Sequence, residues 1–151
     1  MELTDDQKAL FRALLTSVQL LDIHPTNIHS DRGTFGTIDV TGKELNLAWN
    51  QAFTEGDPIK HEENQLLIRP RYEFTVSLEG TVIFSHVSIF VILFGVQNQE
   101  TVDTAFSSPE VKNVFYEKQI MKTMWPLLRQ QVLDGMSRLG LPSIPLPWIV
   151  D

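Results

Sequence analysis

Length, composition and charge set the first bounds on this chain, which has 151 residues, 42% hydrophobic residues, no cysteine and a formal net charge of −7 at pH 7. The size suits one domain over residues 1–151, able to bury roughly two-thirds of its unfolded surface. The acidic charge disfavours nucleic-acid binding, which needs a basic face for the phosphates. No apolar run reaches the ~20 residues of a membrane span, and the lack of cysteine and of a secretory signal fits a cytoplasmic location.

The N-terminal quarter predicts a helix, then a strand, then a loop. Thr4-Asp5-Asp6-Gln7 has the form of a capping box, and apolar residues follow at helical spacing, so we expect a helix from about Asp5 to Thr16. Ser17 to Ile23 can turn into a strand before His24-Pro25 interrupts it. The polar stretch Asn27 to Gly36 predicts a loop.

Alternating apolar residues predict strands in the middle of the chain. Ile38 to Trp49 is typical of two strands, or of one strand with a bulge or turn at Thr41-Gly42-Lys43. The charged stretch Glu55 to Asn64 predicts a connection. Leu66 to Leu78 is the clearest strand, and Pro70 within it indicates an edge or an interruption.

The next predicted strand, Val82 to Val96, is apolar on both of its faces. Glu79-Gly80-Thr81 can close a hairpin into it, and Phe90 and Phe94 lie together on one face. An antiparallel strand usually shows one face to water, so a strand with two apolar faces needs a cover on each. We expect helices of the same chain to cover one face and a second subunit to cover the other.

The C-terminal third predicts one long helix and a tail. After the polar connection Gln97 to Ser107, Ser108-Pro109 is a helix start, and an apolar stripe continues through Pro126, where a missing backbone hydrogen bond predicts a kink. Gly140 can end the helix and Pro142 prevents its resumption, so the apolar tail must run extended. The predicted fold is α+β: a short N-terminal helix, about four antiparallel strands, a long kinked C-terminal helix and an extended tail.

No set of residues predicts catalysis or metal binding. His24, His29, His61 and His86 lack the spacing of a metal site, and we interpret each as a surface or core residue. His61-Glu62-Glu63 could bind a cation, but such a cluster in a polar loop is more often only solvated. There is no glycine motif for phosphate and no nucleophile elbow. We therefore expect no enzyme, no cofactor and no metal.

The segment Trp125 to Leu146 resembles the C-terminal part of the SecB family of export chaperones. In that family the long helix opens with Phe-Pro-Tyr-Ala-Arg and runs on to a Ser-Arg pair, a Phe-Pro and an alternating Leu-x-Leu. The residues at matching positions, without a gap, are Pro126, Arg129, Ser137, Arg138, Pro142 and Leu146. Trp125 replaces Phe, Val132 replaces Ile and Ile144 replaces Leu. The predicted strands resemble the family's sheet more weakly, in order and rough length.

The resemblance implies a SecB-like cytosolic holdase, a homotetramer built as a dimer of dimers that holds unfolded polypeptides in apolar grooves without ATP. The candidate client-binding residues are Phe90, Phe94, Trp125, Leu128, Ile144, Leu146 and Trp148. The candidate structural residues of the signature are Pro126, Arg129, Arg138 and Pro142. For Trp125, core packing is the alternative to client contact. For the two arginines, a solvated or weakly paired side chain is the alternative to docking the helix or the loop.

Two departures from the family pattern bear on partners. The predicted helix Asp5 to Thr16 resembles the extra N-terminal elements of SecB-like chaperones that serve toxin–antitoxin systems, so an antitoxin is an alternative client. The chain stops at Asp151, without the acidic extension that docks on the SecA motor, which places coupling to SecA in doubt. The competing hypothesis is a helix-grip carrier of small lipophilic ligands, which explains neither the proline-rich tail nor a strand apolar on both faces.

Overall fold

The computed structural model describes residues 2–142, 144 and 146 of the protein. The elements in chain order are α1 (Asp5–Ser17), β1 (Val18–Arg32), β2 (Leu45–Phe53), β3 (Ile59–Lys60), β4 (Gln65–Ile68), β5 (Pro70–Leu78), β6 (Thr81–Val96), α2 (Gln99–Phe106), α3 (Pro109–Val114), the π-helical segment η1 (Phe115–Ile120) and α4 (Met121–Arg138). The predicted α+β fold with an N-terminal helix, an antiparallel sheet and a long C-terminal helix is confirmed. The sheet has six strands in the described part of the chain, rather than about four.

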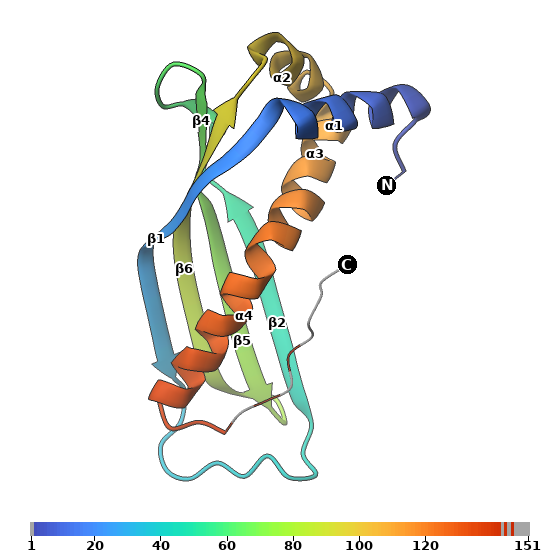
Figure 1. Ribbon diagram of the computed structural model, residues 1–151. Helices are drawn as coiled ribbons and strands as arrows, with labels where there is room; N and C mark the ends of the chain where they lie inside the picture. Colours follow the sequence, from blue (N-terminus) through green and yellow to red (C-terminus); the bar gives the residue numbers. More distant parts are fainter. Residues whose placement is uncertain (1, 143, 145, 147–151) are drawn as a thin grey trace.

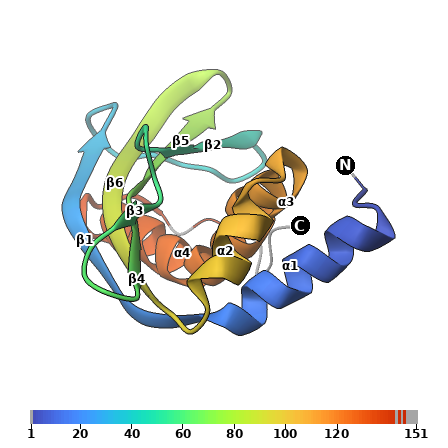
Figure 2. The ribbon, with the colours of Figure 1, turned by 90° about the horizontal axis from the view of Figure 1, so that it is seen from above.

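The sheet is built around β6, its longest strand. One side of β6 pairs with β1, and the other side pairs with β5 and then with β4. β2 pairs with β5, β3 pairs with β4, and every pairing is antiparallel. The sheet curves around α4, which lies along its concave face (Figures 1 and 2). β1 and β2 are therefore the long outer strands of the curved sheet.

The loop predicted for Asn27 to Gly36 is wrong, because β1 continues to Arg32. The partner strand β6 supplies backbone hydrogen-bonding groups along this whole length, and pairing satisfies them. Pro25 lies opposite Phe90, and the register shifts between Pro25 and Asn27. A bulge on an outer strand accommodates a residue without a backbone N–H, so Pro25 does not end the strand.

The middle strands follow local rules more closely. No strand forms at Ile38 to Val40, so only the second of the two predicted strands exists, as β2. The interruption predicted at Pro70 is confirmed, since β4 ends at Ile68 and β5 begins at Pro70. The β5–β6 hairpin is also confirmed: Glu79 and Gly80 have φ values of 48° and 84°, as a tight hairpin turn requires.

The helices after β6 differ from the prediction at the connection before the long helix. The connection predicted for Gln97 to Ser107 contains α2, whose N-cap Asn98 accepts a hydrogen bond from the backbone N–H of Thr101. α4 runs through Pro126 as predicted, the kink there stays a prediction, and the π-helical segment η1 just before α4 was not predicted. The start of α3 is as predicted, with Ser108 as N-cap and Pro109 in the first turn.

The core lies between α4 and the concave face of the sheet. Alternate residues of β6 point into it, among them Phe84, Phe90 and Ile92, which are at most 2% exposed. The other face of β6 carries Val87 and Val91, which neighbouring side chains cover only in part. α1 packs against α2 and α3 beyond the end of the sheet (Figure 2).

Candidate functional site

Aromatic side chains fix α4 onto the sheet. The rings of Trp125 and Phe74 lie 6.1 Å apart between centroids, and both side chains are at most 2% exposed. The hydroxyl of Tyr72 donates a hydrogen bond of 2.6 Å to Gln51 Oε1 on β2. These side chains fill the helix–sheet interface around Trp125.

Four candidate client-binding residues belong to this helix–sheet core. Phe90, Trp125 and Leu128 are at most 2% exposed, and Phe94 is 8% exposed. The Phe94 ring also packs on Phe115 of η1, with 5.9 Å between centroids. In this conformation the four side chains hold α4 on the sheet. Client contact by them stays a prediction, and it requires part of this core to open.

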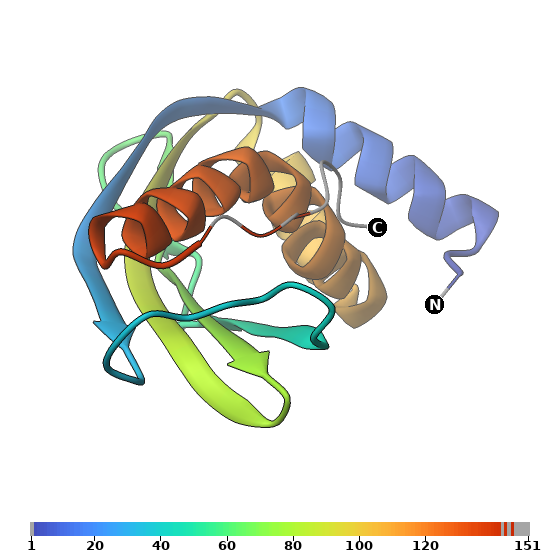
Figure 3. The same ribbon diagram turned by 90° about the horizontal axis from the view of Figure 1, so that it is seen from below.

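The segment after α4 packs back onto the protein. Gly140 has a φ of +71°, and the backbone N–H of Leu141 donates to Met136 O at 2.9 Å, which is the helix ending that the sequence predicts. Leu141, Ile144 and Leu146 are 6–7% exposed although they belong to no helix or strand. The described part of this segment turns back along α4 (Figure 3). Trp148 lies outside the described residues.

The structural signature residues occupy different settings. Pro126 is exposed within α4, Pro142 is half-buried just after it, and Arg129 is half-buried on the helix. Arg138 is exposed at the C-terminal end of α4, where it lines a cavity described below. Their shared role in docking the helix therefore stays a prediction.

An apolar strip that was not predicted as a site lies on the inner face of β2. We define it as Leu45, Leu47 and Trp49, which pair in register with the inward-facing residues Leu78, Val76 and Phe74. The other end of β2 is held by η1, where the Phe53 and Tyr116 rings stack at 4.5 Å. The strip is only partly covered, and Trp49 is 40% exposed. The period-two pattern identified these residues as a strand, but only the position of α4 shows that they are uncovered.

A buried histidine joins three elements of the fold. His86 of β6 is 1% exposed, its Nδ1 lies 2.7 Å from Ser30 Oγ on β1, and its Nε2 lies 3.3 Å from Gln131 Oε1 on α4. Burial lowers the pKa of His86 below its usual value, the hydrogen bond to Gln131 opposes this shift, and His29 adds to it. The sequence offered no signal for this contact, because its partners are distant in the chain.

The described residues offer no group of acidic, histidine or cysteine side chains that could hold a metal ion. Within the same residues, no helix combines the length and the apolar character that crossing a membrane requires.

Comparison with known proteins gives its result through structure alone. No protein-family model matches the sequence, and no curated protein is significantly similar to it. The structure is similar to that of a SecB-like chaperone from Mycobacterium tuberculosis in complex with a ChAD peptide from the HigA1 antitoxin, with a TM-score of 0.66 and 17% sequence identity over 95% of this chain and 99% of that chain. The resemblance drawn from Trp125 to Leu146 is thereby confirmed at the level of the fold, and the chain has the fold of the SecB-like chaperones.

Proposed function

We propose that the protein is an ATP-independent holdase that binds unfolded polypeptides through apolar surface. The observation that carries the proposal is the likeness, over 95% of the chain, to a chaperone whose structure contains a bound antitoxin peptide. We propose that it acts in the cytoplasm, as a single domain spanning residues 1–151 and without a cofactor.

Exposed apolar side chains support this proposal. Trp49 of the β2 strip, Leu20 and Ile28 of β1, and Leu127 of α4 are 40–54% exposed. Unfolded polypeptides present apolar side chains together with unpaired backbone groups, and outer strands such as β1 and β2 can pair with such backbone. We propose that clients bind along the β2 strip, and that the segment holding Ile144 and Leu146 forms one wall of the groove.

Assembly into a homotetramer, as a dimer of dimers, is part of the proposal. The outer face of β6 supports it, because Val87, Ile89, Val91 and Leu93 are only partly covered within one chain. Light scattering at micromolar concentration tests it. A monodisperse species of 17.2 kDa, the mass of one chain, would contradict it.

The client class has two candidates. An antitoxin is favoured by the peptide bound to the similar chaperone and by α1, which packs on α2 and α3 as an addition to the sheet and the long helix. Precursors for export, delivered to the SecA motor, are the second candidate. Binding of an antitoxin peptide and of purified SecA, measured side by side, distinguishes them.

The decisive experiment follows the aggregation of a chemically denatured client that is diluted into buffer with the protein and without nucleotide. We expect suppression at stoichiometric amounts and at both low and high salt, because the interaction is mainly apolar. Trp49→Ser should weaken it, whereas Phe35→Ser, which removes a fully exposed ring from the loop before β2, serves as the matched control. Aggregation as fast as with an inert protein, for several clients and an antitoxin, would refute the proposal.

A further inference from the structure

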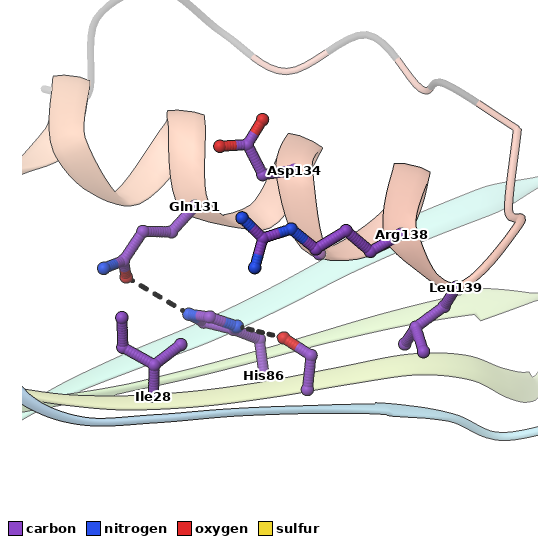
Figure 4. Close-up of a pocket in the computed structure, with 8 residues that line it drawn as sticks. Ile28, His86, Gln131, Asp134, Arg138 and Leu139 are labelled. Carbon is purple, nitrogen blue, oxygen red and sulfur yellow. Dashed lines mark hydrogen bonds between the residues drawn. The ribbon is translucent and has the colours of Figure 1, made fainter.

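A cavity of about 360 Å³ lies between β1 and the C-terminal half of α4. Its lining residues are Ile28, Ser30, His86, Gln131, Asp134, Gly135, Arg138 and Leu139 (Figure 4). The volume is at the lower end of the range for small-ligand sites, which runs from about 300 to 1,000 Å³. β1 and β2 lie on either side of α4 (Figure 2), so the cavity, which Ile28 and Ser30 of β1 line, is on the other side of the helix from the β2 strip.

The floor of the cavity is polar and held in place. His86 Nδ1 lies 2.7 Å from Ser30 Oγ, and Nε2 donates to Gln131 Oε1 at 3.3 Å because an amide oxygen can only accept, so both ring nitrogens are used. Burial lowers the pKa of His86 and so favours the neutral imidazole. Gly135 allows α4 to approach this floor, since a Cβ there would lie 2.8 Å from Ser30 Oγ. The Gln131 side chain accepts through its oxygen, so its NH₂ group is left as a donor at the cavity.

A positively charged side chain, that of Arg138, lies at the opening of the cavity and faces this polar floor. The Arg138 guanidinium extends over His86, whereas Asp134 points away from it (Figure 4). The Asp134 carboxylate accepts a hydrogen bond of 3.0 Å from Gln130 Nε2. Among the described residues, Arg138 forms no ion pair. Ile28, which is 54% exposed, and Leu139 add an apolar rim.

We propose that this cavity binds a carboxylate attached to an apolar group, with the Arg138 guanidinium as its main partner and the Gln131 NH₂ as a second donor. A guanidinium pairs with a carboxylate through two parallel hydrogen bonds, and the neutral imidazole below adds no competing charge. The apolar rim accommodates the side chain next to the carboxylate. This inference rests on the proposed function: the carboxylate is the C-terminal carboxylate of a bound polypeptide. The cavity then adds a polar contact to the apolar binding of that polypeptide.

The test uses N-acetyl-leucine as the probe and N-acetyl-leucinamide as its uncharged counterpart. Calorimetry should detect binding of the carboxylate and at least about tenfold weaker binding of the amide, as expected for losing a charged hydrogen bond. Arg138→Gln should weaken binding of the carboxylate by a similar factor. Lys122→Gln, which removes an exposed cation from the same helix outside the cavity, should not change it. The His86 ring signals in NMR spectra should shift on binding in the wild type and not in Arg138→Gln.

A second arm compares a client peptide that has a free C-terminus with the same peptide amidated. Tighter binding of the free peptide, lost in Arg138→Gln, supports the assignment to polypeptide carboxylates. Equal binding of both peptides, with Arg138-dependent binding of N-acetyl-leucine, overturns the polypeptide source and leaves a site for free small carboxylates. Equal binding of N-acetyl-leucine and its amide, or no effect of Arg138→Gln, overturns the site altogether. Aggregation assays on the same samples test holdase activity directly, so failure of the carboxylate site and failure of the holdase proposal can be told apart.

Discussion

Gly135 provides a direct test of how α4 is seated on the sheet, because two opposing effects on stability can be weighed there. Gly135→Ala should stabilise an isolated helix by about 1 kcal/mol. In the folded protein, the new Cβ would lie 2.8 Å from Ser30 Oγ and 3.0 Å from Phe84 Cζ. Phe84 is fully buried and cannot move aside cheaply. Forcing a methyl group into such a contact costs about 1–3 kcal/mol.

The contact with Ser30 adds a further cost. If Ser30 rotates away, it gives up its 2.7 Å hydrogen bond to His86, which is worth about 1 kcal/mol. The net expectation for Gly135→Ala is a loss of about 1–3 kcal/mol in the free energy of unfolding, or a few degrees in Tm for a chain of this length.

Urea denaturation of a double-mutant cycle measures the reasoning. Ser30→Ala removes the nearer of the two contacts, so Gly135→Ala should cost less in that background than in the wild type. Helix propensity favours alanine over glycine, so a loss of stability in Gly135→Ala cannot be attributed to helix propensity. A stability gain near the full propensity value in the wild-type background would show that α4 is not seated as described.

Three further predictions concern buried groups. Because burial lowers the pKa of His86 in the folded state, the unfolded chain binds the proton more readily, so stability should be complete above pH ~6.5 and fall as the pH drops below it. Urea titrations at pH 7.5 and 5.5 should show a smaller fall in the free energy of unfolding for His86→Gln than for the wild type. An equal fall in both would contradict the assignment. Tyr72→Phe leaves Gln51 Oε1 without its 2.6 Å donor and should lower the free energy of unfolding by about 1–2 kcal/mol, as thermal scans would show. The Tyr116 hydroxyl has no partner among the described residues, so Tyr116→Phe should be neutral or stabilising in the same scans. Truncation after Pro142 removes the buried side chains of Ile144 and Leu146, so it should lower the free energy of unfolding by about 2–5 kcal/mol and also weaken the suppression of aggregation. Suppression is measured below the Tm of the truncated protein, and unchanged suppression would show that the tail takes no part in client binding.

Local rules accounted for the parts of the fold where a residue acts on its immediate neighbours. The capping box at Thr4, the turn at Glu79-Gly80 and the helix ending at Gly140 all form as predicted, because each depends on backbone geometry within a few residues. The interruption at Pro70 belongs to the same class. The SecB-like fold also followed from a local run of residues, Trp125 to Leu146, through resemblance.

The misses occur where a distant partner decides. Asn27 to Arg32 is polar and was predicted as a loop, but it pairs with β6, which supplies its backbone hydrogen bonds. The predicted strand at Ile38 to Val40 does not form, since alternation alone does not supply a neighbour. Client contact by Phe90, Trp125 and Leu128 stays a prediction, and only the tertiary structure shows that these side chains are buried between α4 and the sheet within one chain.

The sequence by itself determined the fold class, through the order of the predicted helices and strands. It also determined the α1 cap, the hairpin into β6 and the end of α4, each of which depends on residues within a few positions. The tertiary structure alone decided which apolar residues are left uncovered and which polar residues meet. Trp49 is 40% exposed in the middle of β2, and His86 meets Ser30 and Gln131 across 56 and 45 positions of the chain. Burial and hydrogen bonding at such separations depend on how β1, β6 and α4 pack together, a relation that no local pattern contains.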